Sequence, residues 1–171
     1  MGVLEELKSN LSVGARGNKY KVTLAIPGGG SGKTTDIMCK GASIPAKTLG
    51  TIEVFNQGRK ILVAGDASFE NSWSLTFWST QDHALRKDFE TWMDGIDNFD
   101  EHTRASAGYT DYMTTAQVAQ LSTSDNSETA VYEFHNLFPT NISALDLADD
   151  ANDTILEFSV DLAYSHWIRN S

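Results

Sequence analysis

Cysteine, long apolar runs and positive charge are scarce in this chain. The single Cys39 excludes an intramolecular disulfide framework, and no apolar run approaches the ~18 residues of a membrane-spanning helix. Only 13 Lys and Arg residues stand against 23 Asp and Glu residues, so we expect no charge-driven binding to nucleic acid or anionic lipid. Apolar residues, by contrast, make up 40% of the 171 residues, too much for a disordered protein. We therefore expect one folded domain over residues 1–171.

The N-terminal residues carry no recognisable targeting segment. Met1 to Glu6 lack a basic flank followed by an apolar stretch, and Glu6 stands where a myristoylation motif has Ser or Thr. We therefore expect a protein made in a cytoplasm, without a membrane anchor. The glycosylation sequons at Asn10, Asn141 and Asn152 then have no role.

Charge is distributed unevenly along the chain. Residues 1–60 carry nine basic and four acidic side chains, a balance of +5, whereas residues 61–171 carry four basic and nineteen acidic ones, a balance of −15. Complementary charged regions steer copies of a protein to meet head to tail. The alternative is that the two segments interleave in the fold, so that the asymmetry disappears in space.

Short segments with period-two alternation dominate the sequence. They predict strands at residues 19–26, 37–42, 51–55, 59–64, 68–79, 113–121, 129–135 and 156–164. The first two strands are expected to form a hairpin across a turn at residues 27–36, and Gly58 suits a tight turn at residues 56–58. Pro139 is expected to break the pairing after the strand at 129–135.

Two segments have helical periodicity. Leu85, Phe89 and Trp92 form one apolar stripe in a helix over residues 82–96, which Thr80 or Asp82 can cap. Residues 1–18 form a short amphipathic helix or an arm that orders on a neighbour. The predicted fold is mainly β (α+β): an antiparallel barrel or sandwich of two packed sheets over residues 19–167, flanked by one amphipathic helix.

A glycine-rich segment, Gly28 to Thr35, imitates a phosphate-binding loop. Pro27 stands where that motif has its first glycine, the preceding strand alternates, and the residues after Lys33 are expected to form a strand instead of a helix. A flexible hairpin tip is the favoured interpretation. A nucleotide-binding enzyme is the alternative, and it predicts ATP affinity that Lys33→Ala removes.

Other residue types that carry chemistry are scattered. The four histidines have no metal-binding spacing, and the acidic stretch at residues 146–153 lacks the glycine and glutamate of a calcium loop. Cys39 is expected to be a buried, inert thiol. We therefore predict no catalytic, cofactor-binding or metal-binding residues and no enzymatic activity.

Several short motifs follow one another along the chain. They are Cys39-Lys40 with Pro45 downstream, Arg59 to Asp66, Phe69 with Trp73, the helix residues His83, Arg86, Phe89 and Trp92, Phe138 to Asn141, and a terminal strand that reaches Trp167. In these features the sequence resembles the tail tube proteins of T-even-type contractile bacteriophages. The resemblance extends from about Tyr20 to Trp167.

This resemblance implies a structural virion protein whose hexameric rings stack into a hollow tube inside a contractile sheath. Its implied partners are other copies of itself, the sheath protein, the tape measure protein, the baseplate hub or tube initiator, the tail terminator, and genomic DNA in transit without specific binding. The implied location is the virion tail, after assembly in the host bacterial cytoplasm. Joining the sheets of six subunits into one barrel would also remove exposed sheet edges.

The resemblance further implies that the segment from Ile44 to Lys60 reaches a neighbouring ring. The predicted subunit and ring contacts are Ile44, Pro45, Lys47, Leu49, Ile52, Val54, Phe55, Arg59 and Lys60. Because alternation alone does not distinguish burial within a subunit from burial between subunits, ordinary core packing is the alternative.

The acidic balance suits a conduit for DNA, because carboxylates repel phosphates. Glu157 and Asp161, on the polar face of the last predicted strand, are the candidate lumen residues, and the sheath-facing surface is their alternative position.

Other functions compete with a phage tail tube. Close alternatives are the inner tube of a phage-derived contractile injection system or tailocin, a tube-initiating baseplate protein, and, more distantly, the tube of type VI secretion. A soluble ligand-binding barrel would instead be a monomer with an apolar cavity.

Overall fold

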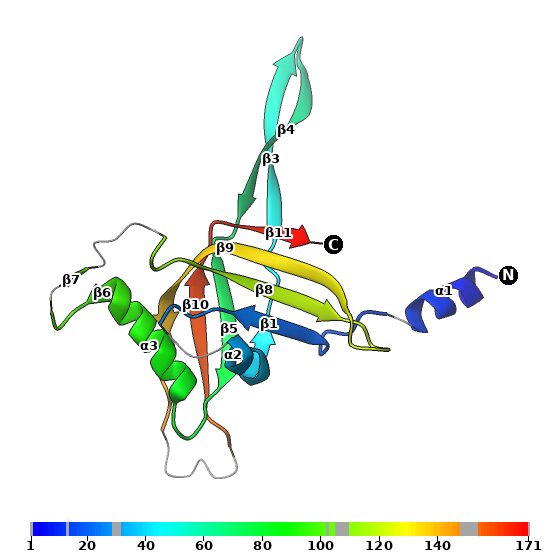
Figure 1. Cartoon of the computed structure of the whole chain (residues 1–171). Coiled ribbons are helices and arrows are strands. Elements are labelled where there is room, and N and C mark those ends of the chain that lie inside the picture. The colour runs from blue at the N-terminus through cyan, green and yellow to red at the C-terminus, as the bar shows by residue number, and fades with distance from the viewer. Residues whose placement is uncertain are drawn as a thin grey trace.

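Two antiparallel sheets that share one strand form the body of the protein (Figure 1). The computed structural model describes residues 2–12, 14–28, 32–101, 103–104, 110–147 and 154–170. Sheet A has the order β1 (Tyr20–Leu24), β8 (Thr114–Leu121), β9 (Glu128–Ile142), β11 (His166–Asn170). Sheet B has the order β2 (Cys39–Ala42), β5 (Ser72–Trp78), β10 (Glu157–Ala163) and the C-terminal part of β9. The predicted class, two packed antiparallel sheets, is confirmed.

Strand β9 passes from one sheet into the other. The pairing of β9 with β8 and β11 ends at Leu137 and His135, as the expected break over residues 137–141 requires. The strand itself does not end there: β9 continues through Pro139, which lies opposite Leu162 where the β9–β10 register shifts. The Thr140 hydroxyl donates a hydrogen bond to the Asp161 carbonyl at 3.0 Å beside this irregularity. A bulge is one of the places where a sheet tolerates proline, because a ladder hydrogen bond is already missing there.

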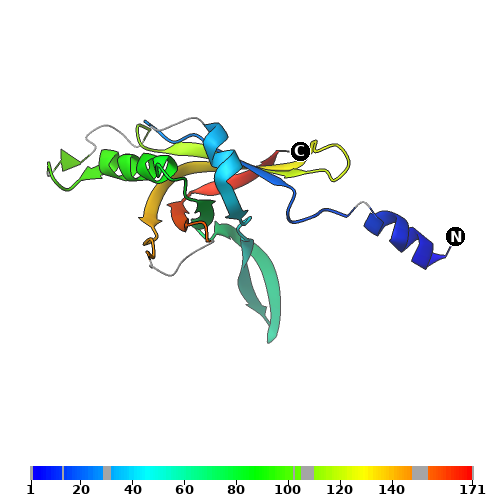
Figure 2. The same cartoon turned by 90° about the horizontal axis from the view of Figure 1, so that it is seen from below.

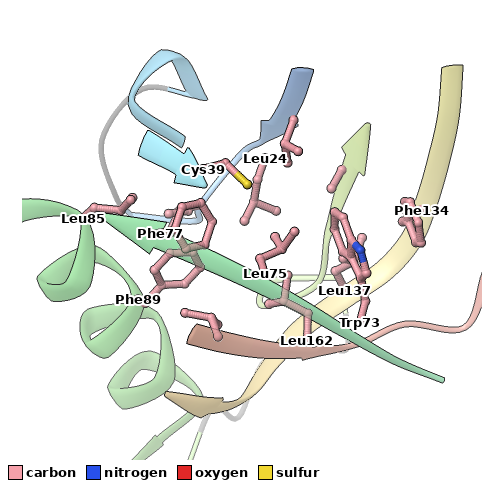
Figure 3. Close-up of a cluster of buried hydrophobic side chains, with 14 of the residues drawn as sticks. Leu24, Cys39, Trp73, Leu75, Phe77, Leu85, Phe89, Phe134, Leu137 and Leu162 are labelled. Atoms are coloured by element: carbon pink, nitrogen blue, oxygen red, sulfur yellow. The ribbon is translucent and has the colours of Figure 1, made fainter. Parts of the chain in front are cut away.

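Aromatic side chains fill the space between the sheets (Figure 3). Trp73 of sheet B stacks on Phe134 of sheet A with ring centroids 4.3 Å apart, and both are 1% exposed or less. Phe77 and Phe158, from neighbouring strands of sheet B, contact each other with centroids 5.7 Å apart. Along β10 the even-numbered residues are buried, as its alternation predicted. One continuous core therefore joins both sheets.

Helix α3 (Ala84–Ile96) covers one end of this core. Its Phe89 contacts Phe77 with ring centroids 5.5 Å apart, and Leu85 and Trp92 are also buried, so the predicted stripe is confirmed. The helix starts after His83, which has a φ of 50° and contacts the Ser79 hydroxyl through Nδ1 at 2.7 Å.

The segment between β1 and β2 contains a short helix, α2 (Gly32–Met38). The expected turn over residues 27–36 and the strand starting at residue 37 are therefore wrong. The predicted hairpin is wrong too, because β1 pairs with β8 and β2 pairs with β5. The side chain of Thr35 is 1% exposed, and its hydroxyl oxygen lies 3.4 Å from both the backbone nitrogen and the carbonyl oxygen of Leu24. This tertiary contact holds α2 against β1.

Five further elements lie outside the sandwich. Helix α1 (Val3–Ser12) lies apart from the body, and β3 (Lys47–Asn56) pairs with β4 (Arg59–Phe69) in a long hairpin (Figure 1). The two-residue strands β6 (Asp97–Asn98) and β7 (Thr103–Arg104) pair after α3. No helix in the described part of the chain has the length and apolar character needed to cross a membrane.

Candidate assembly surfaces

The β3–β4 hairpin projects from the body into solvent (Figures 1 and 2). Within the described residues its strands pair only with each other, up to the Asn56–Arg59 pair at the tip. Gln57 and Gly58 have φ values of 48° and 78°, as in the type I′ turn whose twist matches that of a hairpin. The predicted tight turn is confirmed.

Two glycines bring the hairpin strands together near its base. The β3–β4 register shifts between Leu49 and Thr51. A Cβ atom on Gly65 would lie 3.1 Å from the carbonyl carbon and oxygen of Gly50. Because these are backbone atoms, a side chain at Gly65 would require the two strands to shift by a few tenths of an ångström.

Both faces of the hairpin expose apolar side chains. One face, which we call the aliphatic face, consists of Ile52, Val54, Ile61 and Val63. The other, which we call the mixed face, consists of Leu49, Glu53, Phe55, Lys60 and Leu62. The apolar side chains of both faces are 44–68% exposed. Since a lone two-stranded hairpin is marginally stable and contiguous apolar patches mark interaction sites, both faces are candidate contact surfaces.

The predicted contact residues lie on this hairpin or directly before it. Eight of them are exposed: Ile44, Lys47, Leu49, Ile52, Val54, Phe55, Arg59 and Lys60. Only Pro45 is buried, so core packing within the subunit accounts for that residue alone. Lys60 forms an ion pair with Glu53 across the hairpin. The role of all nine in subunit and ring contacts stays a prediction.

The two candidate lumen residues lie on the outer face of sheet B, away from the core. Glu157 pairs with Lys40 of β2 through an Oε1–Nζ distance of 2.5 Å. Asp161 accepts a hydrogen bond from the Asn141 amide at 3.1 Å. Both acidic side chains are therefore partly held by neighbouring strands, and their lumen position stays a prediction.

Sheet A has two edge strands, β1 and β11, and within the described chain each pairs with a neighbouring strand on one side only. Its outer face carries two registered rows of residues. One row is Thr23, Gln117, Glu133 and Ile168, and the next is Lys21, Ala119, Val131 and Asn170. Lys21 and Glu133 are the charged residues of these rows, so the rows balance in charge. Unpaired edges are templates for pairing with another chain.

Sequence reasoning missed part of this surface. It ended the contact segment at Lys60 and left out Ile61, Leu62 and Val63 of β4, which are exposed like their partners on β3. The two-residue turn at Gln57 and Gly58 defines the register of the hairpin, and that register would have paired these residues with β3. It also left residues 1–18 open between a helix and an arm, and the structure has α1 there.

The segment that imitates a phosphate-binding loop has a mixed outcome. Helix α2 begins at Gly32, so one of the three objections, a following strand, is wrong. The other two stand: Pro27 has no amide hydrogen to offer, and β1 is an antiparallel edge strand. Residues 29–31 lie outside the described residues.

The remaining candidates for chemistry are Cys39, the histidines and the acidic stretch at residues 146–153. Burial raises the pKa of the Cys39 thiol to about 11, and the prediction of a buried thiol is confirmed. Among the described residues, no three His, Cys, Asp or Glu side chains gather closely enough to hold a metal ion. His102 and residues 148–153 of the acidic stretch lie outside that description.

Comparisons with known proteins agree with a role in assembly. The phage tail tube protein family matches residues 15–170. The tail tube protein gp19 of Enterobacteria phage T4 is 30% identical over 154 residues, covering 90% of both chains, and the tail tube protein of Serratia phage KSP90 is 28% identical over 171 residues, covering 96% of this chain and 95% of its own.

Solved structures share the fold at lower identity. A chain of the sheath/tube terminator of the PVC extracellular contractile injection system has a TM-score of 0.67 and 13% identity, covering 92% of this chain and 97% of its own. A chain of the anti-feeding prophage baseplate has a TM-score of 0.66 and 14% identity, covering 92% and 96%. From the match over residues 15–170 and the relatives of similar length, this chain belongs to the phage tail tube protein family.

Proposed function

We propose that this tail tube subunit forms hexameric rings that stack into the hollow inner tube of a contractile tail, a structural role without catalysis. The observation that carries the proposal is the hairpin, whose apolar side chains are 44–68% exposed in the single subunit. A chain of this family gains by burying that surface against other copies. The hairpin then makes the contact between rings, through the residues from Ile44 to Lys60 and their partners on β4.

Sheet A supports closure of the ring. Pairing β1 of one subunit with β11 of the next would occupy both free edges. Six copies of this four-stranded sheet give about 24 strands, and strands about 4.8 Å apart make a barrel about 37 Å across at the backbone, wider if the strands tilt. Such a barrel leaves room for a DNA duplex.

The outer faces of sheet A and sheet B are the two candidate linings for the bore of this tube. The charge argument favours the outer face of sheet B, with Glu157 and Asp161. The ring geometry favours the outer face of sheet A: a second sheet inside the barrel, packed about 10 Å away, would narrow the bore to about 17 Å. That width is measured between backbones, and lining side chains would reduce it below what a duplex needs, since the two groove depths alone add up to about 16 Å.

Labelling assembled tubes decides between the faces. Gln117→Cys tests sheet A and Ser159→Cys tests sheet B, both in a Cys39→Ala background. A small thiol-reactive biotin reagent enters the tube and labels a cysteine that faces the bore, whereas streptavidin is too large to enter. Streptavidin therefore binds a labelled bore cysteine only after the tubes are dissolved. Capture of Gln117→Cys on intact tubes would exclude sheet A. A charge test complements it: if Glu157→Lys with Asp161→Lys delivers DNA normally at low salt, these carboxylates have no role in transit.

Contacts with other tail proteins complete the proposal. The fold likeness to chains of a sheath/tube terminator and a baseplate supports contacts with sheath protein, baseplate hub or tube initiator, and tail terminator. The tape measure protein and passing DNA would occupy the bore. The subunit would assemble in the host cytoplasm and remain in the virion tail.

An injection-system tube is the second candidate, supported by the same fold likeness. Neighbouring genes separate the two functions: capsid and terminase genes indicate a phage, and toxin genes without a capsid indicate an injection system.

Electron microscopy with sedimentation of the purified protein tests the main proposal. We expect hollow tubes or stacked six-membered rings whose amount rises with concentration. A companion test replaces the gene in its phage by a nonsense allele, which should leave particles without tail tubes until the wild-type gene is supplied. A strict monomer together with normal tails in the nonsense mutant would overturn the proposal.

A further inference from the structure

Helix α1 has an apolar stripe that the rest of the described chain leaves uncovered. Val3, Leu4, Leu7 and Leu11 are 52–84% exposed, and both views place α1 apart from the body and from the hairpin (Figures 1 and 2). An isolated helix of ten residues is marginal in water, so α1 gains stability from a surface that covers the stripe.

The aliphatic face of the hairpin has the complementary character. Its four side chains are all β-branched and apolar, they form two directly opposed cross-strand pairs, and they are 44–55% exposed. The mixed face is less suitable, because the Glu53–Lys60 ion pair interrupts its apolar residues. A helix with one apolar stripe buries more on the uninterrupted face.

Charge at the rim of the aliphatic face agrees with this choice. Arg59 lies beside it, paired with Asn56 at the tip, and forms no ion pair among the described residues. On α1, Glu6 borders the apolar stripe on the side of Val3, whereas Glu5 lies almost opposite the stripe. A helix seated on the aliphatic face can therefore bring the Glu6 carboxylate to the Arg59 guanidinium.

We propose that α1 of one subunit docks on the aliphatic face of the hairpin of another subunit. Leu4, Leu7 and Leu11 pack on the β-branched side chains, and Glu6 pairs with Arg59. A second copy is the occupant because α1 and the hairpin of one chain lie at separate ends of the molecule in both views. The inference rests on the proposed function, since it requires copies stacked closely enough to exchange these elements.

Disulfide trapping between two differently tagged subunits tests the contact. In a Cys39→Ala background, Leu7→Cys subunits are mixed with Val63→Cys subunits, assembled, oxidised and separated without reductant. Two matched controls use the neighbouring residue on the wrong face: Glu5→Cys with Val63→Cys, and Leu7→Cys with Leu62→Cys. We expect a cross-linked heterodimer with the first pair, and about tenfold less with either control.

A charge exchange gives a second readout that needs no cysteine. Glu6→Arg and Arg59→Glu should each raise the critical concentration for assembly about threefold to tenfold, and the double variant should recover most of that loss. Electron microscopy of the same samples separates the two proposals. Wild-type protein without tubes, together with normal tails in the nonsense mutant, would overturn the proposed function. Tubes with equal cross-linking to the control positions, or without rescue in the double variant, would overturn this contact alone.

Discussion

Strands β4 and β5 are adjacent in the chain and both carry large apolar side chains, yet only those of β5 are buried. Trp73, Leu75 and Phe77 of β5 are 1% exposed or less, whereas Ile61 and Val63 of β4 are about half exposed. A second sheet covers β5, and β4 has only its hairpin partner. The apolar residues of a strand therefore indicate that a face has to be covered, and the surrounding elements decide whether it is covered within the subunit or by another copy.

Breaking the body should have the largest effect on folding. Phe134→Ala removes a fully buried ring that stacks on Trp73, so we expect the free energy of unfolding to fall by about 3–5 kcal/mol. Denaturant titration at a concentration below assembly measures this. Phe55→Ala in the hairpin, 68% exposed, is the matched control and should change the value by less than about 0.5 kcal/mol. Equal losses would remove the distinction between the two regions.

Breaking the hairpin should have the largest effect on assembly. Val54→Asp places a carboxylate on the aliphatic face, which would cost several kcal/mol to bury without a partner, so sedimentable tubes should disappear. The unfolding transition of the monomer should keep its midpoint. Thr91→Asp, at an exposed position of α3, serves as the control and should assemble normally. Tubes formed by Val54→Asp at wild-type concentration would show that this face stays open to solvent.

The pH dependence of unfolding can separate the body from the hairpin further, because the Cys39 thiol lies in the body. Its pKa is about 11 in the folded chain and about 8.5–9 in an unfolded one. The folded protein keeps the thiol proton longer, so the free energy of unfolding should fall as pH rises from about 9 to 11, by about 2–3 kcal/mol in total. Subtracting the same pH series for Cys39→Ala isolates this contribution. A difference that stays flat over that range would mean that the thiol is solvated.

Breaking either of two ion pairs of similar exposure should have the smallest effect on the free energy of unfolding. Glu157→Gln breaks the Lys40 pair in the body and should lower the free energy of unfolding by less than about 1 kcal/mol, because both side chains are partly solvated. Glu53→Gln breaks the Lys60 pair in the hairpin and should leave the global transition unchanged. Both differences should vanish in about 1 M salt. A larger effect from Glu53→Gln would mean that the hairpin unfolds together with the body.

The sequence was sufficient to predict those elements whose local residue pattern favours the same structure as their tertiary environment. Strand β10, helix α3 and the turn at Gly58 carry a clear period or a residue type suited to the turn, and the structure confirms them. Helix α2 was missed because Gly32, Thr34 and Thr35 are weak helix formers, and the contact of Thr35 with β1 compensates for them.

The pairing of strands was harder to predict than their positions. The continuity of β9 through Pro139 depends on a bulge opposite Leu162, which belongs to a strand some twenty residues later. For the candidate surface, the sequence located residues 44–60 through resemblance, but exposure depends on the absence of a covering sheet. That property belongs to the whole fold, and no local pattern contains it.

The backbone contact between Gly50 and Gly65 lies near the base of a long hairpin, so a small tilt there would move the tip. From Gly50 to Gln57 the strand extends about 23 Å, so a tilt of about 5° at the base would displace the tip by about 2 Å. An error of that size would recur in every ring and accumulate along a stack. The close approach of these two glycines therefore bears on how straight such a stack can be.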